Sequence, residues 1–360
     1  MKILIIGFAK IKYMPYLNFY LENINKDKND VHLLYWNRDM QEEDISHIQN
    51  VTLHEYKHYQ EDDVSRLTKI GSFLKFRHFA KNLIKKENFD FVIVLTSVVA
   101  VLLSDVLKQY KGKYIYDYRD ITYENFAPYK RVVEALVKNS YYTFVSSDGF
   151  RKYLPEACAD KIFTTYNILV DSFKHRDEKF LYGTDSRKIR IAFWGYIRHE
   201  HLNMKIIDRL KNDDRFELHY YGREQDIAKN IKKYVADTGV ENVFFHGEYK
   251  PEDRYGFVRN TDIIHNMYDD SNMMLAVGNK YYDGIIFCLP QICTEGSYMG
   301  ELVESKGIGV ALDPDSESFN ETIFDYYINI NNQEFRKKCD EEAAVIEQNY
   351  TRLADIIKSL

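Results

Sequence analysis

Short apolar runs alternate along the chain with longer stretches in which apolar residues recur at helical spacing. The runs are rich in β-branched and aromatic residues, which is typical of buried strands. They occupy residues 2–6, 31–36, 91–95, 113–116, 141–145, 189–194, 216–221, 243–245, 262–267, 285–293 and 308–312. The helical pattern is clearest at residues 16–23, 73–86, 98–109, 130–138, 204–211 and 225–238. This alternation predicts an α/β fold in which helices cover both faces of parallel sheets.

The alternation pauses once, at residues 171–188. This segment is polar, has no apolar period and carries two clusters of charge, and a new apolar run follows it at once. A chain of 360 residues is also long for one compact domain. We therefore expect two Rossmann-like, doubly wound domains, at residues 1–170 and 186–339.

The composition narrows the classes of partner. A formal net charge of -6 argues against a nucleic-acid binder, which is usually basic. The four cysteines form no CxxC pair and have no histidine cluster at zinc spacing, so we expect no metal site and a reducing, cytoplasmic location. The first apolar run is too brief for a signal peptide, and no segment reaches the roughly 18 apolar residues of a membrane span.

Ligands of doubly wound sheets bind beyond the carboxyl ends of the strands, so the residues that follow each run are the candidates. Gly7 follows the first run, and Gly195, Gly222 and Gly247 follow three runs of the second half. Glycine lets a backbone approach a ligand closely. The alternative is that these are ordinary turn glycines. Three in succession in one half favour a ligand site there, and polar strand ends that face one another would form a cleft.

A charged loop follows Gly195. Arg198 is placed to bind a diphosphate through its forked guanidinium, although a solvated loop charge is the alternative. We expect Asn203 to cap the helix that follows. His199 and His201 are expected to be solvated loop histidines.

The segment GNKYYDGIIFCLPQIC, which begins at Gly278, contains several candidate binding residues close together. We expect Asn279 to cap a short helix that runs into a strand near Pro290. Lys280 and Asp283 are three residues apart, so they share a helical face. Lys280 and the positive end of the helix are suited to phosphate oxygens, and Asp283 to ribose hydroxyls. The alternative is a surface ion pair worth roughly a few tenths of a kcal/mol.

The second half resembles the donor domain of GT-B glycosyltransferases, especially the family-4-like group that builds bacterial capsule and lipopolysaccharide chains. The matching segments are IAFWGYIRHEHLN, FELHYYG, NVFFHGEY, NKYYDGIIFCLPQI and GELVESKGIGVAL, across about residues 186–315. Asp283 and Pro290 keep that family's interval. The first half is similar only in outline, through the Gly7 loop, YIYDYRD and VSSDGF. Retaining members carry two glutamates eight positions apart; here the first falls on Leu275, which leaves retention or inversion open.

The resemblance implies a GT-B fold, in which two Rossmann-like domains face across a cleft. It makes residues 1–170, joined by about 340–360 of a last helix that crosses back, the acceptor-binding domain. Residues 186–339 become the donor-binding domain. The expected reaction moves a sugar from a nucleotide-sugar, expected to be UDP-linked, to a saccharide or lipid-linked saccharide acceptor. The nucleotide-sugar is a co-substrate, so no further cofactor is expected.

The resemblance also suggests roles for single residues. Tyr249 is expected to stack near the base. Asp120 is the candidate catalytic base, with Asp117 as a weaker one, and the alternative for Asp120 is a helix cap or a pair with Arg119. No DxD motif is placed for a metal-dependent transferase, so we expect metal-independent donor binding. A nucleotide-sugar 2-epimerase and a non-catalytic sugar-binding protein remain alternatives.

Residues 65–86 carry seven Lys or Arg and no acid, interleaved with apolar residues at helical spacing. A basic amphipathic helix is attracted to anionic lipid headgroups. One interpretation is that this segment contacts the inner face of the cell membrane. The alternative is a helix of the domain that packs its apolar face on the sheet.

Overall fold

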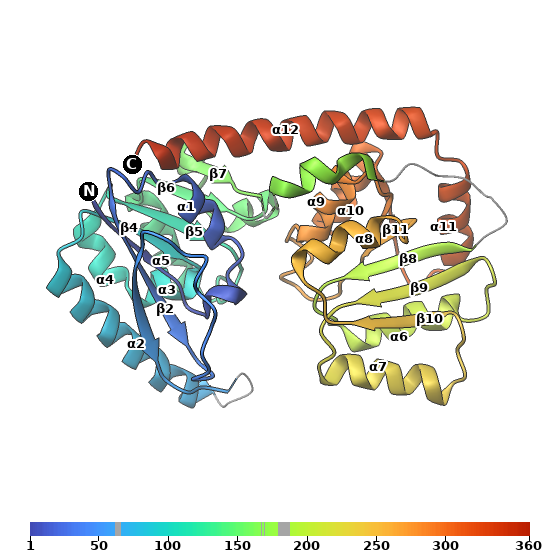
Figure 1. Ribbon diagram of the computed structural model, residues 1–360, viewed down its shortest axis with the longest axis horizontal. Helices are drawn as coiled ribbons and strands as arrows, with labels where there is room; N and C mark the ends of the chain where they lie inside the picture. Colours follow the sequence, from blue (N-terminus) through green and yellow to red (C-terminus); the bar gives the residue numbers. More distant parts are fainter. Residues whose placement is uncertain (62–65, 167, 169, 179–187) are drawn as a thin grey trace. The chain divides into compact units, whose positions relative to one another are not determined.

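The computed structural model describes residues 1–61, 66–166, 168, 170–178 and 188–360 (Figure 1). The chain divides into two compact units. The first comprises Met1–Thr165 with Asn349–Leu360, and the second comprises Tyr166–Gln348. The predicted domain boundary at 171–188 falls partly on residues 179–187, which lie outside the described residues.

The first unit is built on a seven-stranded sheet in the order β3-β2-β1-β4-β5-β6-β7, in which every pair of neighbours is parallel. Its strands are β1 (Lys2–Ile6), β2 (Asp30–Asn37), β3 (Thr52–Lys57), β4 (Phe91–Leu95), β5 (Tyr114–Tyr118), β6 (Tyr142–Val145) and β7 (Ile162–Thr164). The strand order reverses between β1 and β4, where Ile3 pairs with Val31 on one side and Phe91 on the other. That reversal is the topological switch point of a doubly wound sheet.

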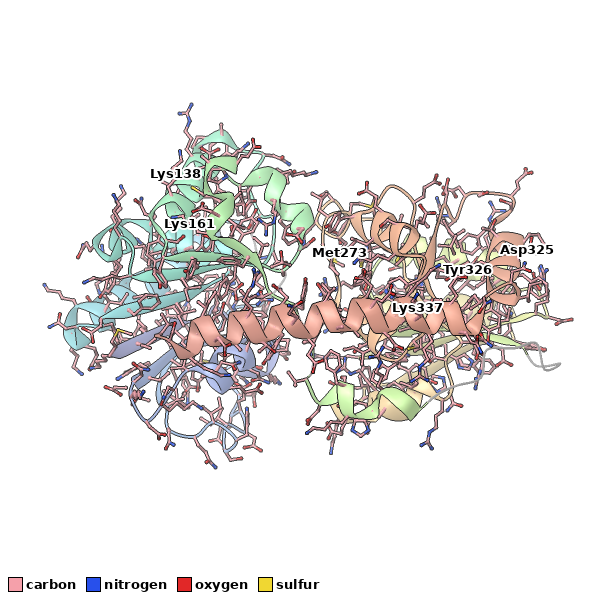
Figure 2. All side chains as sticks on the ribbon, turned by 90° about the horizontal axis from the view of Figure 1, so that it is seen from above. Lys138, Lys161, Met273, Asp325, Tyr326 and Lys337 are labelled. Atoms are coloured by element: carbon pink, nitrogen blue, oxygen red, sulfur yellow. The ribbon has the colours of Figure 1, made fainter. Side chains whose placement is uncertain are left out.

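Helices cover both faces of this sheet (Figure 1). They are α1 (Leu17–Asn23), α2 (Arg66–Glu87), α3 (Ser97–Leu102), α4 (Ser104–Leu107) and α5 (Ala127–Asn139). The last helix, α12 (Asn332–Lys358), inserts Leu353, Ala354 and Ile357 into the core of this unit. At the end of the sheet near β7, Lys161 Nζ donates to the carbonyl of Lys138 at 2.8 Å (Figure 2). The prediction that the last helix returns to the first domain is confirmed.

The second unit has a six-stranded parallel sheet in the order β10-β9-β8-β11-β12-β13. Its strands are β8 (Ile189–Trp194), β9 (Phe216–Tyr221), β10 (Val243–Gly247), β11 (Ile263–Asn266), β12 (Gln291–Thr294) and β13 (Gly309–Leu312). Its helices are α6 (Glu200–Leu210), α7 (Asp226–Asp237), α8 (Arg254–Val258), α9 (Asn279–Ile286), α10 (Tyr298–Lys306) and α11 (Phe319–Ile328).

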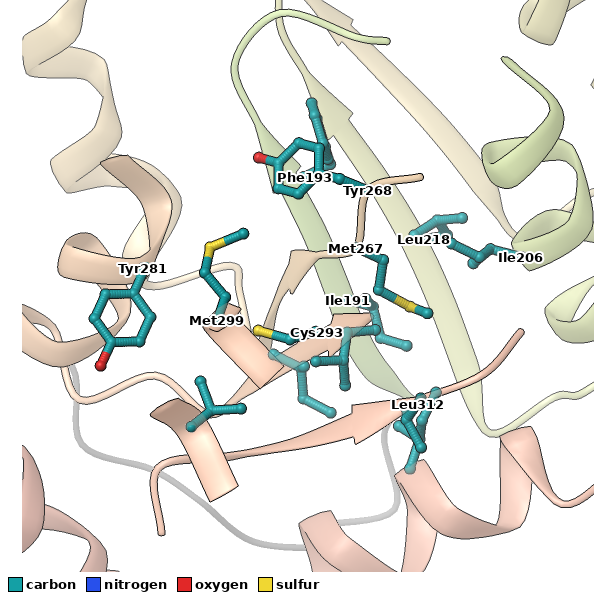
Figure 3. Packing of buried hydrophobic residues seen from close by; sticks show 14 of the residues in the cluster. Ile191, Phe193, Ile206, Leu218, Met267, Tyr268, Tyr281, Cys293, Met299 and Leu312 are labelled. Carbon is teal, nitrogen blue, oxygen red and sulfur yellow. The ribbon is translucent and has the colours of Figure 1, made fainter. Parts of the chain in front are cut away.

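Alternating side chains of a strand pack in two different hydrophobic cores, because successive residues point to opposite faces of a sheet. Ile191 and Phe193 pack in one cluster with Leu218 (Figure 3), whereas Ala192 and Trp194 pack in another. Both units are therefore parallel α/β domains, as predicted.

The predicted run 285–293 is wrong as a single strand, whereas the expected short helix that leads into a strand near Pro290 is confirmed. Its first part completes α9, a turn follows in which the amide of Leu289 donates to Gly284 O at 2.8 Å, and β12 begins only at Gln291. Helix, turn and strand are all buried here, so the apolar pattern cannot separate them. The strands β3 and β7 were not predicted, because β3 is half-exposed and polar and β7 has three residues.

Candidate functional site

Three strands of the second unit end in glycine or are directly followed by glycine at one edge of the sheet. The amide of Gly195 donates to Tyr221 O, and the amide of Gly222 donates to Gly247 O, both at 2.8 Å. Gly195 and Gly247 have φ of 125° and 81°, which favour glycine. A Cβ on Gly222 would lie 1.8 Å from the carbonyl oxygen of Gly195. The three predicted glycines therefore lie together, and backbone groups rather than side chains line this edge.

Lys280 lies where the strand order of this sheet reverses. Its Nζ is 3.3 Å from the ring centroid of Phe193, at the end of β8, and 4.9 Å from that of Tyr268, just after β11. These two rings contact each other edge to face (Figure 3). Lys280 is only 6% exposed, and no side chain or carbonyl in the described part of the chain accepts a hydrogen bond from it. A buried amine without an acceptor is charged most readily when an anion binds beside it, so this arrangement points to an anionic ligand.

The N-cap of α9 is Gly278, so the predicted capping role of Asn279 is wrong. Asn279 is the first helical residue and Lys280 follows it in the first turn. The unpaired amides of that turn carry positive partial charge, which adds to the ammonium charge.

Asp283 forms a buried ion pair with Arg254, at 2.8 Å between Oδ2 and Nη1. The alternative of an exposed Lys280–Asp283 pair is therefore wrong, since both side chains are buried and Asp283 pairs elsewhere. Burial raises the pKa of Asp283, while Arg254 and Lys280 oppose that shift. Tyr249 lies near this ion pair. Burial raises the pKa of Tyr249 to about 12, and the charges of Arg254 and Asp283 also act on it.

Arg198 is exposed and lies 4.9 Å over the ring of Tyr196. Burial lowers the pKa of Lys280 well below its usual range, and the nearby Arg198 cation lowers it further. The structure thus brings the side chains of Lys280 and Arg198 close enough for the charge of Arg198 to act on Lys280. Both had been predicted from the sequence.

The side chain of His199 is largely enclosed, so the prediction of a solvated histidine is wrong. Its Nδ1 contacts Asp269 Oδ1, and its Nε2 lies 3.4 Å from Asp270 Oδ2. The side chain is 8% exposed, and φ of 60° places the residue in the left-handed region just before α6. A strained non-glycine residue at a ligand edge is often part of a site. His201 is exposed, as predicted.

Asn203 does not cap α6, because the helix already begins at Glu200. Its Nδ2 instead donates to the carbonyls of Arg198 and His199, at 2.5 and 2.9 Å. Its Oδ1 accepts from the buried Tyr220 hydroxyl at 2.8 Å. Asn203 therefore anchors the loop that presents Arg198.

The first unit holds the remaining predicted residues. A Cβ on Gly7 would lie 2.5 Å from Met14 Sδ, so a side chain already fills that space. Asp117 is fully buried between Arg119 Nε and the Tyr20 hydroxyl, each at 2.8 Å, which makes it structural. Asp120 is exposed after β5.

Asp120 does not cap the next helix, since α5 begins at Ala127 with Phe126 as its N-cap. Within the described ranges, no group of three or more His, Cys, Asp or Glu is placed to hold a metal ion. A hollow of about 680 Å³ around Asn23–Asp27 lies at the amino-terminal edge of the first sheet, away from the strand ends where ligands bind.

The two parallel sheets and the last helix shared between the units define the GT-B fold. Over all of both chains, the structure is similar to HepE from Anabaena in complex with UDP, with 13% identity and a TM-score of 0.69. It is also similar to sucrose-phosphate synthase from Thermosynechococcus elongatus, with 11% identity and a TM-score of 0.72 over 99% and 98% of the two chains. UDP-GlcNAc 2-epimerase from Neisseria meningitidis, bound to UDP-GlcNAc, matches at 13% identity and a TM-score of 0.56 over 98% and 100%. No protein-family model matches the chain, and no curated protein matches its sequence.

Proposed function

We propose that this protein transfers a sugar from a UDP-sugar to a saccharide or lipid-linked saccharide acceptor. The observation that carries the proposal is Lys280, a buried ammonium at the switch point with two aromatic rings around it and no hydrogen-bond acceptor among the described residues. A diphosphate supplies the missing acceptor. The UDP-bound and UDP-GlcNAc-bound structures of the same fold support this assignment.

In this proposal the second unit binds the donor. Lys280 and Arg198 stabilise the leaving diphosphate, where negative charge develops in the transition state. Tyr249 stacks near the base. Asp283 keeps one carboxylate oxygen for the ribose, because Arg254 holds the other. Lys280, Arg198 and the helix N-termini offset the diphosphate charge without a metal ion.

The first unit binds the acceptor. Asp120 takes the proton of the acceptor hydroxyl if the reaction inverts configuration. Replacing Asp120 with Asn is then expected to lower kcat and leave UDP affinity unchanged. An unchanged kcat removes Asp120 from the reaction.

Thermal unfolding in the presence of UDP-, GDP-, dTDP- and CMP-sugars tests the donor. A ligand at about 100 times its Kd adds roughly 2.7 kcal/mol to the free energy of unfolding. We expect this stabilisation from a UDP-sugar in the wild type, and its loss in Lys280→Met. If no nucleotide-sugar stabilises the wild type, the proposal is wrong.

The similarity to a UDP-GlcNAc 2-epimerase favours one second candidate, epimerisation at C2 of the same donor. The two reactions leave different products. Incubating a UDP-sugar with the protein in deuterated water gives deuterium at C2 in an epimerase. A transferase instead releases UDP and leaves C2 unlabelled.

We further propose a role in bacterial surface polysaccharide synthesis, on the inner face of the cell membrane, through α2. Phe76 and Ala80 of this helix are fully buried, so it packs on the domain, whereas Ile70 and Leu74 are 53% and 54% exposed. No helix in the described ranges is long and apolar enough to cross a bilayer. Exposed apolar residues among lysines fit adsorption to an anionic surface.

Co-sedimentation with phosphatidylglycerol and phosphatidylcholine vesicles tests the membrane proposal. We expect binding to the anionic vesicles only, and weaker binding after Lys75 and Lys85 are both changed to Glu. Lys337→Glu on α12, whose side chain is 76% exposed, is the control. Equal binding to both vesicle types contradicts the proposal.

A further inference from the structure

The loop between β5 and α5 exposes two aromatic side chains. Tyr123 is 58% exposed and Phe126 is 64% exposed. Most Phe and Tyr side chains of β4, β5 and β6 are buried in the core. Two large exposed rings on one short loop are unfavourable unless they bind something. The loop follows the carboxyl end of β5, the edge of the sheet where doubly wound domains bind ligands.

The same loop also carries a buried carboxylate. Glu124 is 2% exposed, and it accepts from Ser97 Oγ at 3.1 Å and from the amide of Thr122 at 2.5 Å. Ser97 Oγ is also 2.8 Å from the hydroxyl of Tyr129. No Lys or Arg pairs with Glu124 in the part of the chain that the structure describes. Burying a carboxylate with only neutral donors costs stability, so this group is expected to have a function.

The hydroxyl network around Glu124 is incomplete. The hydroxyls of Tyr116 and Tyr118 are buried close to Ser97 and Glu124, but neither meets the geometry of a hydrogen bond. Thr96, at the end of β4, has φ of 77°, a strained conformation for a β-branched residue. This backbone geometry leads directly into Ser97. The strain and the unsatisfied hydroxyls are both typical of a binding site rather than of a relaxed core.

The outer side of the network is accessible. Thr122 is exposed and Tyr129 is half-buried, and the Thr122 hydroxyl donates to Ser97 Oγ at 3.3 Å. The ring of Tyr123 packs edge to face on that of Tyr129, with centroids 5.5 Å apart. Flat rings beside a row of hydroxyl groups match a pyranose, which has an apolar C–H face and a polar rim.

We propose that the loop 119–126 is a saccharide-binding platform, in which Tyr123 and Phe126 stack on a sugar ring and Glu124 positions the loop. It deepens the proposed function, on which it rests, because it names the acceptor surface of the first unit. The platform favours an acceptor whose terminal group is an uncharged pyranose, since its stacking surface consists of two exposed aromatic rings.

Saturation-transfer NMR tests the platform without any nucleotide. The probes are the methyl glycosides of glucose, galactose, mannose and N-acetylglucosamine. We expect saturation transfer to at least one of them from the wild type, and its loss in the Tyr123→Ala, Phe126→Ala double variant. Tyr141→Ala is the matched control, because Tyr141 is 42% exposed but precedes β6, at the opposite edge of the sheet. No transfer from the wild type, or equal transfer from the double variant, overturns the inference.

Kinetics with a UDP-sugar donor separate this inference from the proposed function. We expect the double variant to raise the acceptor KM about tenfold or more, the effect of a loss of about 1.4 kcal/mol. The Kd for UDP and the rate of donor hydrolysis should not change. Failure of the wild type to bind UDP refutes the proposed function alone, since the NMR experiment does not use the donor.

Glu124→Gln tests the positioning role. The amide keeps the size of the side chain but cannot accept from both of its donors as the carboxylate does. We expect Glu124→Gln to raise the acceptor KM at an unchanged kcat. Glu124→Asp keeps the charge, and we expect it to have a lower free energy of unfolding than Glu124→Gln. If Glu124→Gln lowers only the free energy of unfolding and leaves KM unchanged, Glu124 does not position the platform.

Discussion

Replacing Lys280 with Met separates a ligand-binding lysine from a structural one, because the two roles predict opposite effects. Met is similar in length and fills apolar space well. The change removes a buried amine whose pKa is depressed by burial and which makes no hydrogen bond within the described residues. It also removes the contacts of the ammonium with two aromatic rings, at 3.3 and 4.9 Å.

The magnitudes follow from these contacts. Losing the cation–π contacts costs about 0.5–2 kcal/mol, and the sulfur–aromatic contacts of Met return about 0.3–1.5 kcal/mol. Relief of the desolvation of the amine adds to the stability of the variant. We therefore expect the free energy of unfolding to change by less than about 1 kcal/mol. Loss of a charged hydrogen bond to the diphosphate costs about 1.5–3 kcal/mol, so UDP should bind roughly tenfold to a hundredfold more weakly.

Calorimetry gives the affinity, and tryptophan fluorescence gives the stability. The chain has two tryptophans, Trp36 in the first unit and Trp194 in the second, so a Trp36→Phe background reports on the second unit alone. Lys205→Met is the control, since Lys205 is half-exposed and pairs with Asp315. Unchanged UDP affinity in Lys280→Met refutes the reasoning, and so does a loss of several kcal/mol of stability with UDP affinity intact.

The pH dependence provides an independent check on Lys280. Its pKa is lowered in the free protein, and a bound diphosphate is expected to raise it. Binding then takes up a proton, so affinity is highest below the free-state pKa and falls as the pH rises toward the bound-state pKa. Calorimetry over a range of pH, in two buffers of different ionisation enthalpy at each pH, should reveal this uptake, and it should be absent in Lys280→Met.

Three further outcomes are expected. Gly222→Ala places a Cβ 1.8 Å from a neighbouring carbonyl oxygen, so it should weaken UDP binding and lose about 1–3 kcal/mol in urea unfolding, whereas Gly256→Ala meets nothing within 4 Å and should not. Burial lowers the pKa of His265 from 6.5 to about 3, so its stabilisation is present above pH 6.5 and is lost as the pH falls toward 3. His265→Asn should flatten that slope by up to about 1.4 kcal/mol per pH unit. Arg254→Ala leaves the Asp283 carboxylate buried and unpaired, at a cost of about 3–5 kcal/mol that a second change, Asp283→Leu, should largely restore.

The sequence predicted the fold well because buried parallel strands leave a strong local signal. The runs 2–6, 91–95 and 189–194 coincide with strands whose side chains are almost all buried. The strand prediction failed where the burial of a segment does not follow from its local pattern of apolar and polar residues. β3 carries His, Glu and Lys on a half-exposed edge, and residues 285–289 are apolar but helical and turning.

The sequence predicted where in the fold the candidate site lies, but not which charged side chains pair with one another there. The rule that ligands bind beyond strand ends brought Gly195 and Arg198 into consideration, whereas Lys280 was found through its spacing from Asp283; in the structure the charge of Arg198 acts on Lys280. Arg254 lies 29 residues before its partner Asp283, and no local spacing indicates that pair. The burial of His199 depends on Asp269, which is 70 residues away. Such contacts are set by the tertiary fold and leave no periodic trace in the sequence.

A structure of the protein with bound UDP tests the central claim most directly. The account predicts a phosphate oxygen about 3 Å from Lys280 Nζ, at the charged hydrogen-bond distance, with the diphosphate beside Gly195 and Arg198. UDP bound elsewhere, with Lys280 still enclosed by Phe193 and Tyr268 and contacting no phosphate, would contradict it.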